Sequence, residues 1–281
     1  MAGLAFRIVN VFARAARLSG NPLAVVEDGR GLDDRAMQAL ARQFNLSETT
    51  FILPSQSATA RVRIFTPAYE LPFAGHPTLG TAHVVRSLAS AGDAVRLEMR
   101  AGIIPVSAKG DRWTLEARPA RWREARESAA EIAAMLGLEA ADVLGPRLWV
   151  NAGTEQLIVP LASRAAVERA RPVSEKFLGL ESEDRPGKML VFADDGDAQA
   201  TALARFFFPA NGAILEDPAT GSACANLGGW FQSTRPGQAV RRVIAQGEAV
   251  ARPSTLYLSV ADGAIRVGGD VIELGRGQVT L

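Results

Sequence analysis

The stretch RIFTPAYELPFAGHPTLGTAHVV, residues 63–85, has a counterpart later in the chain, RFFFPANGAILEDPATGSACANLGGW, residues 205–230. Each copy begins with an Arg-Xaa-Phe-Xaa-Pro strand, continues through an acidic loop, and ends with a glycine, a polar residue and an apolar helix. The loop is four residues longer in the second copy, and the alignment pairs Gly75–His76 with Gly221–Ser222. This internal repeat predicts two α/β halves with the same architecture.

Apolar runs between turn residues predict the elements of the first half. A helix capped by Asp33 or Asp34 reaches about Phe44, and an apolar helix covers residues 77–90. The predicted strands are FRIVNVF (6–12), LAVVED (23–28), TTFILP (49–54), ARVRIFTP (60–67), AVRLEM (94–99), GIIPVSA (102–108) and RWTLEA (112–117).

The second half repeats this order after a charged and then amphipathic stretch, residues 118–138, in which we place the boundary near residue 120. The predicted domains are residues 1–120 and 121–281, with final strands that can return to the first lobe. The predicted elements are strands at 147–153, 156–162, 188–195 and 202–209, helices at 164–170 and 222–233, and closing strands over 241–274.

Composition excludes several classes of protein. The chain of 281 residues is 48% hydrophobic, enough for a sizeable core and about two domains. Its 31 basic and 30 acidic residues give a net charge of +1, which argues against nucleic-acid and anionic-membrane partners. The single cysteine, Cys224, rules out an internal disulfide and a cysteine-rich metal site. Without a secretory signal or an apolar run of about 20 residues, we expect a cytoplasmic protein.

The two repeated helix starts are candidate anion sites. Pro77 suits the first helical turn, so His76 is the predicted N-cap, and Ser222 is the predicted N-cap of the second helix. Each start would present N–H donors and the positive end of a helix dipole, and the glycine before it would let a ligand approach. The pair would then hold a small anionic substrate, unless both are simply well-capped core helices.

Two histidines and two carboxylates are the candidate reactive groups. His76 and His83 are seven residues apart with no third ligand, so no metal site is predicted; His83 fits a core histidine, and His76 would face substrate. Glu48 precedes the apolar run TTFIL, where burial would raise its pKa toward that of a general acid/base, although a capping or solvent-facing role is the alternative. Asp217 is equally a turn residue before Pro218 or a functional group. Glu70 and Glu216 have weaker cases.

Five segments in order resemble one family over about residues 8–270. The segments are SGNPLAVV (19–26), SETTFIL (47–53), FTPAYELPFAGHPTLGTAHVV (65–85), EDPATGSACANL (216–227) and QGEAVARPSTLYLSV (246–260). Together they are similar to the PhzF-like isomerases of phenazine biosynthesis, which have the diaminopimelate epimerase-like fold. The resemblance implies an α+β protein of two similar lobes, each a β-sheet wrapped around a central helix, with the active site between the lobes.

The resemblance also implies roles for individual residues. The acid of the ETTF motif, Glu48, would be the general acid/base, with His76 and Asp217 assisting proton transfer or orienting the substrate. Gly75, Gly221 and Ser222 would bind the substrate. A homodimer that needs neither a metal nor an organic cofactor is implied as well.

One departure from the wider superfamily bears on the reaction. Racemases and epimerases of this fold place a thiol at each helix start, but those places hold Ala74 and Thr220 here, and Cys224 lies a turn later in the predicted core. Two-thiol racemisation is therefore excluded, because inversion requires an acid and a base on opposite faces.

We predict a cofactor-independent isomerase. It would move a proton on a small unsaturated cyclic carboxylic or amino acid such as dihydro-hydroxyanthranilate, with specificity set by loops 67–74 and 209–218. The alternatives are an epimerase or a dehydratase in the same cleft, and a non-enzymatic interaction protein.

Overall fold

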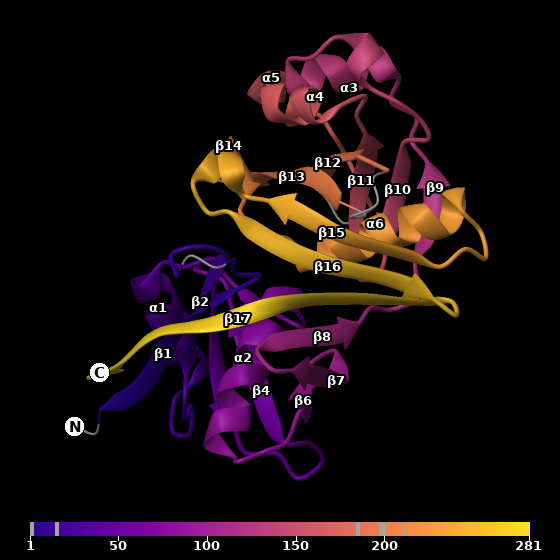
Figure 1. Cartoon of the computed structure of the whole chain (residues 1–281). Helices are drawn as coiled ribbons and strands as arrows, with labels where there is room; N and C mark the ends of the chain where they lie inside the picture. The colour runs from indigo at the N-terminus through magenta and orange to yellow at the C-terminus, as the bar shows by residue number, and fades with distance from the viewer. Residues whose placement is uncertain (1–2, 15–16, 184–185, 197–200, 211) are drawn as a thin grey trace. The chain divides into compact units, whose positions relative to one another are not determined.

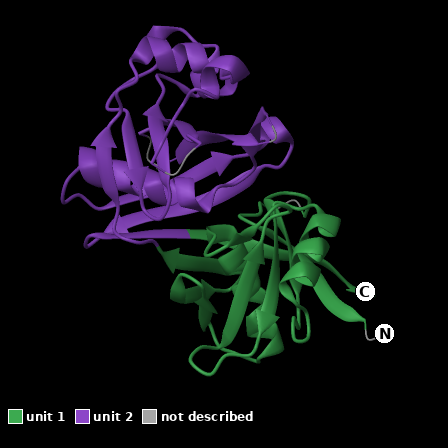
Figure 2. Ribbon diagram, turned by 180° about the vertical axis from the view of Figure 1, so that it is seen from behind, with its two compact units in different colours: residues 1–116, 268–281 green, residues 117–267 purple. Residues whose placement is uncertain are grey.

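Strands dominate the computed structural model of the chain, which describes residues 3–14, 17–183, 186–196, 201–210 and 212–281 (Figure 1). The fold is a mixed α/β fold with few helices. It divides into two units: unit 1 comprises Met1–Glu116 and Gly268–Leu281, and unit 2 comprises Ala117–Val267 (Figure 2). Strand β17 (Ala264–Val279) begins in unit 2 and ends in unit 1.

Unit 1 contains two helices, α1 (Asp34–Phe44) and α2 (Gly75–Leu88). Its strands are β1 (Leu4–Val11), β2 (Asn21–Val26), β3 (Glu48–Leu53), β4 (Ala60–Phe65), β5 (Glu70–Leu71), β6 (Ala94–Met99), β7 (Gly102–Lys109) and β8 (Arg112–Glu116). The pairings β1–β2, β3–β4, β6–β7 and β7–β8 are antiparallel, whereas β2–β3 and β4–β6 are parallel. Strand β5 forms a hairpin on β4, and β17 pairs with β1 and β8.

Unit 2 repeats this order of pairings. Its strands are β9 (Arg121–Glu124), β10 (Leu148–Asn151), β11 (Glu155–Pro160), β12 (Met189–Asp194), β13 (Thr201–Ala210), β14 (Ala213–Asp217), β15 (Val240–Gln246) and β16 (Ser254–Ala261). Its helices are α3 (Ala129–Leu136), α4 (Arg164–Arg169), α5 (Ser174–Phe177) and α6 (Gly221–Thr234). The pairings β10–β11, β12–β13 and β15–β16 are antiparallel, β11–β12 and β13–β15 are parallel, and β14 forms a hairpin on β13.

A buried helix packs against the strands of each unit. Helix α2 packs against β1 to β4 and β6 to β8 of unit 1 (Figure 1). Helix α6 packs against β9, β10, β11 and β16 of unit 2. Nine of the 14 residues in each helix are buried. Close packing requires small residues: a Cβ at Gly80 would lie 2.7 Å from Cδ2 of Leu23, and one at Gly228 would lie 2.6 Å from Cγ2 of Ile265.

Further helices cover other parts of the strand layers. In unit 1, Met37 and Leu40 of α1 pack with Phe51 and Phe65 of neighbouring strands. In unit 2, buried residues of α3, α4 and α5 form one core with β10 to β13. Side chains on either face of the strands are therefore buried, as expected for strands that read as continuous apolar runs.

The repeated Arg-Xaa-Phe motif forms the same ion-pair arrangement in each unit. Arg63 makes two hydrogen bonds of 2.8 Å to the Glu70 carboxylate, and Arg205 makes bonds of 3.0 and 2.6 Å to Glu216. Each guanidinium also lies over the ring of the Phe two residues later, at 5.0 Å and 4.9 Å. The arginine therefore joins each strand to its hairpin partner, although the second loop is longer. Glu70 and Glu216 are structural groups.

Most predicted strands and helices are present, with two kinds of difference. Helix α3 was not predicted, because its stretch was interpreted only as an amphipathic segment at the domain boundary. Short elements β5, β9, β14 and α5 were not predicted either, because segments of two to five residues carry little periodicity. The predicted helices 77–90 and 222–233 begin earlier, at Gly75 and Gly221. In the part of the chain that the structure describes, no helix is both long and apolar enough to cross a membrane.

Substitution of Gly80 by alanine tests the close packing of α2. We expect Gly80→Ala to lower the free energy of unfolding by about 1–3 kcal/mol, because the added methyl group meets Leu23 and Val11. Gly92→Ala is the control, since a Cβ there has no neighbour within 4 Å. Urea unfolding followed by circular dichroism measures both. Equal urea midpoints for the two variants would contradict close packing of α2 at Gly80.

Candidate active site

Helix α2 begins two residues earlier than predicted, and this changes the position of His76. The N-cap is Ala74, with extended backbone angles, and its carbonyl accepts hydrogen bonds from the backbone N–H and the Oγ1 of Thr78, at 3.2 and 2.7 Å. His76 is the second helical residue and only 7% exposed. The predictions of His76 as N-cap and as an exposed ring are therefore wrong. Pro77 is the third helical residue, two positions later than predicted, and it is tolerated there because the N–H groups of the whole first turn lack helical partners.

Helix α6 shows the same shift in unit 2. Its N-cap is Thr220 rather than Ser222, and the Thr220 carbonyl accepts the first helical bond from the Cys224 N–H at 3.0 Å. Gly221 and Ser222 are thus the first and second residues of α6, as Gly75 and His76 are of α2. The pairing of the two helix starts holds, while both predicted caps move by two residues.

Neither N-cap residue caps its helix with its own side chain. Ala74 has no polar side-chain atom. The Thr220 hydroxyl is engaged elsewhere: it donates to Oδ2 of Asp217 at 2.5 Å and accepts from Nε2 of Gln246 at 3.1 Å. Both helices therefore begin without the side-chain acceptor that usually satisfies the first N–H groups, an arrangement suited to an anionic ligand.

Glu48 and His76 come together in unit 1. Glu48 opens β3, and its Oε2 lies 3.3 Å from Nε2 of His76. Both side chains are mostly buried, at 16% and 8% exposure. His76 also hydrogen bonds to the backbone of Pro22, which has no N–H, so the Pro22 carbonyl must accept. Because Nε2 makes no hydrogen bond to a described residue, Nδ1 is the donor.

The environment of His76 favours the neutral ring. Burial lowers its pKa from 6.5 to about 3, and the hydrogen bond to the Pro22 carbonyl opposes this shift with a smaller effect. A neutral ring with its proton on Nδ1 presents the Nε2 lone pair toward Glu48. Glu48 consequently faces an acceptor. When Glu48 carries a proton, His76 can accept a hydrogen bond from it.

Asp217 and Ser222 lie at the start of α6 in unit 2. Asp217 ends β14; its carboxylate accepts from Thr220, and its carbonyl accepts from Nε2 of Gln246 at 2.9 Å. Ser222 accepts a hydrogen bond of 3.0 Å from Nε2 of Gln156. The amide residues Gln246 and Gln156 were not predicted. They lie on strands distant in sequence, and a lone glutamine within an apolar run carries no motif.

Cys224 and His83 occupy structural positions. Cys224 is 3% exposed, and burial raises the pKa of its thiol, so it stays protonated in the core of unit 2. The ring of His83 accepts at Nδ1 from the indole N–H of Trp113, at 3.3 Å. Within the described ranges there is no group of three or more His, Cys, Asp or Glu side chains that could hold a metal ion.

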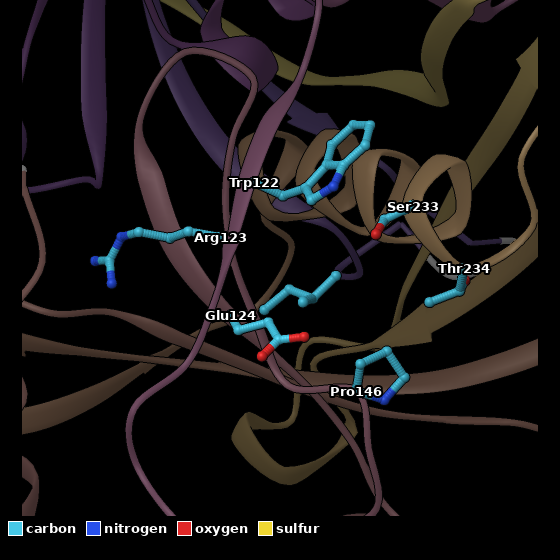
Figure 3. A pocket seen from close by; sticks show the side chains of 7 residues that line it. Trp122, Arg123, Glu124, Pro146, Ser233 and Thr234 are labelled. Atoms are coloured by element: carbon cyan, nitrogen blue, oxygen red, sulfur yellow. The ribbon is translucent and has the colours of Figure 1, made fainter.

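A cavity of about 560 Å³ in unit 2 contains none of the predicted site residues. Its lining is Trp122, Arg123, Glu124, Pro146, Leu148, Ser233 and Thr234 (Figure 3). The Arg123 guanidinium points away from the cavity in Figure 3, and it pairs with Glu155 at 2.9 Å. The lining offers no acid/base pair comparable to Glu48 and His76.

Two units with the same order of strand pairings, each with a buried helix and an uncapped helix start, define an epimerase-type α/β fold. Comparison with known proteins agrees. A solved structure of a predicted epimerase from Pseudomonas aeruginosa has a TM-score of 0.79 and 31% identity, and the match covers 99% of both chains.

The family follows from sequence. The family model described as phenazine biosynthesis-like protein, PhzC-PhzF, matches residues 9–274. An uncharacterized isomerase from Pasteurella multocida is 37% identical over 280 residues, which cover 98% of this chain and 93% of the relative. The trans-2,3-dihydro-3-hydroxyanthranilate isomerase of Pseudomonas aeruginosa is 35% identical over 289 residues and 98% of each chain. This chain belongs to the PhzF family of isomerases.

The buried neutral His76 predicts a loss of stability in acid. The unfolded chain binds a proton at this imidazole below pH 6.5, while the folded chain binds one only near pH 3. Stability should therefore fall as the pH is lowered between these values, by about 3 kcal/mol from pH 7 to pH 4. In His76→Gln this part of the pH dependence disappears, whereas His83→Gln keeps it. Urea unfolding at both pH values measures the difference; identical slopes for wild type and His76→Gln would contradict a buried neutral ring.

The uncapped start of α2 predicts an opposition between stability and binding. Ala74→Ser supplies an N-cap acceptor and should raise the free energy of unfolding by about 1 kcal/mol. The same hydroxyl would occupy N–H groups needed by a carboxylate, so affinity for benzoate, used as a simple probe, should fall. Ala89→Ser at the other end of α2 is the control for both measurements. If Ala74→Ser stabilises the protein but binds benzoate as tightly as wild type, the start of α2 does not bind the anion.

Proposed function

We propose that the protein is a cofactor-independent isomerase that moves a proton within a small unsaturated cyclic acid, with Glu48 as the general acid/base. The contact of Glu48 with His76 carries this proposal. It places a carboxylate beside a neutral imidazole, 3.3 Å away, next to a helix start without a side-chain cap. A carboxylate in partly desolvated surroundings is suited to accept a proton from carbon.

The proposed reaction has two proton transfers. Glu48 removes a proton from a carbon next to the unsaturated system, and the electron pair of that C–H bond is delocalised into the system. His76, accepting at Nε2, holds the protonated Glu48 in place by a hydrogen bond. The proton on the Glu48 carboxyl exchanges with solvent, and Glu48 then donates a proton to a different carbon, so the substrate is isomerised with no net gain or loss of atoms. General acid/base catalysis of this kind contributes about 10²- to 10⁴-fold in rate.

Each helix start offers binding groups in this proposal. In unit 1 the backbone donors that begin with Gly75 would bind a carboxylate or the developing enolate. In unit 2 the backbone donors that begin with Gly221, with the Ser222 hydroxyl as an additional donor, would bind an anionic group. Asp217, fixed by Thr220 and Gln246, would orient an amino or hydroxyl group of the substrate. A homodimer is part of the same proposal.

The relative with the named activity supplies the first substrate to test. The similarity to trans-2,3-dihydro-3-hydroxyanthranilate isomerase extends over 98% of both chains, and at 35% identity it supports a related cyclic amino acid as the substrate class. The absence of a thiol at either N-cap, Ala74 or Thr220, supports a one-carboxylate proton shift over two-base racemisation.

Deuterium incorporation tests the role of Glu48. Wild type incubated with trans-2,3-dihydro-3-hydroxyanthranilate in deuterated water should form isomerised product that contains deuterium at the protonated carbon. Glu48→Gln cannot take up the proton and should lower the rate about 10²- to 10⁴-fold. Glu98→Gln, which changes a carboxylate held by Ser55 and Ser57 in the same unit, should react like wild type. Incorporation at the wild-type rate by Glu48→Gln would remove Glu48 from the proposed role.

A further inference from the structure

A chain of side-chain amides lies behind Ser222 in unit 2. Nε2 of Gln156 donates to Oγ of Ser222 at 3.0 Å, and Oε1 of Gln156 accepts from Nδ2 of Asn226 at 2.8 Å. Both amide side chains are 1% exposed. Ser222 and Asn226 are four residues apart in α6, so they share a helix face, and Gln156 on β11 spans the two.

Backbone groups determine which way each amide points. The Ala152 N–H can only donate, so the atom of Asn226 that it meets at 2.8 Å is Oδ1. The Thr154 carbonyl can only accept, so the atom that it meets at 3.0 Å is Nδ2. With Asn226 fixed, Gln156 must turn its Oε1 to Nδ2 of Asn226 and its Nε2 to Ser222.

This orientation has a consequence for the Ser222 hydroxyl. Its oxygen accepts a hydrogen bond from Gln156, and its own proton makes no hydrogen bond to any group among the described residues. A hydroxyl held in this way is directed to donate outward. Ser222 is also partly exposed at an uncapped helix start, where an anionic group would find this proton together with backbone N–H groups.

The counterpart positions in unit 1 show that the fold does not require the amides. Counting from Gly75 and Gly221, Asn226 corresponds to Gly80. A Cβ at Gly80 would meet Leu23 and Val11, so apolar side chains fill that place in unit 1. Two buried amides in unit 2 must keep every hydrogen bond satisfied, which an apolar pair need not do.

We propose that Asn226 and Gln156 are positioning residues that keep the proton of the Ser222 hydroxyl available for donation to an anionic group of the ligand. This inference rests on the proposed function for the identity of the ligand but not for the orientation of the amides. The inference predicts that the ligand carries a hydrogen-bond acceptor, such as a carboxylate, which binds at the start of α6.

Reversal of the amide chain is the sharpest test. In Gln156→Glu the carboxylate accepts the Ser222 proton, so the hydroxyl no longer donates to ligand. Affinity for 3-hydroxyanthranilate, measured by calorimetry and independent of turnover, should fall about tenfold to a hundredfold. Gln156→Leu, which copies the apolar counterpart in unit 1, should lower it about threefold to tenfold. Gln232→Leu in the same helix, which loses only a bond to the Gly263 carbonyl, is the control.

The Ser222→Ala background separates positioning from general structural damage. If Gln156 acts through Ser222, Gln156→Glu and Gln156→Leu should change the affinity less than about twofold once the hydroxyl is gone. Equal losses in both backgrounds would overturn the inference. Should Gln156→Glu fail to fold by circular dichroism, Gln156→Leu decides the question in the same way.

Binding and turnover distinguish this inference from the proposed function. If the Gln156 variants lose affinity only when Ser222 is present, the role of the amide chain is supported. If the wild type nevertheless does not isomerise dihydro-hydroxyanthranilate, the proposed reaction is contradicted. Wild type that binds no 3-hydroxyanthranilate would contradict both.

Discussion

Burial of a central helix among the strands of each unit restricts where chemistry can occur. The flanks of α2 and α6 are packed, with Gly80 and Gly228 against apolar side chains, so a ligand can meet these helices at their ends but not along the packed flanks. At both beginnings the residue that would normally cap the helix does not do so: Ala74 lacks an acceptor, and Thr220 is held by Asp217 and Gln246. A buried helix with an uncapped start is a stable element with an unsatisfied end, which stabilises negative charge.

The two units use this common element differently. In unit 1 the second helical residue is His76, beside Glu48; in unit 2 it is Ser222, beside Gln156. Arg63 pairs with Phe51 and Arg205 pairs with Val191 in the strand register. Glu48 and Lys188 each lie three residues before these partners, so they occupy equivalent positions. The carboxylate that exchanges a proton with carbon in the proposed reaction thus occurs at one of the two equivalent positions. The proposal therefore assigns acid/base groups to unit 1 and hydrogen-bond donors to unit 2.

Sequence predicted the repeat and the residues near the two helix starts, but not the burial of His76. Arg63 with Glu70 and Arg205 with Glu216 recur because each ion pair joins a strand to its hairpin, and this spacing is readable despite the four-residue difference. The N-caps were misplaced because Pro77 is acceptable anywhere in a first turn, so it does not fix the first residue. The partners of Ser222 and Asp217 could not be predicted, since Gln156 and Gln246 reach the helix start only through tertiary packing. The joint placement of Glu48 and His76 likewise depends on the packing of β3 against α2.

The state of the His76 ring is central to this account, because the hydrogen bond from Nδ1 to Pro22 turns Nε2 toward Glu48. Ring nitrogen NMR spectra of ¹⁵N-labelled protein measure it directly. The chain has two histidines, so His83→Gln assigns the signals. We expect a neutral ring protonated on Nδ1, with shifts unchanged between pH 7.5 and pH 5. A ring that becomes doubly protonated near pH 6.5, or one that carries its proton on Nε2, would contradict the account.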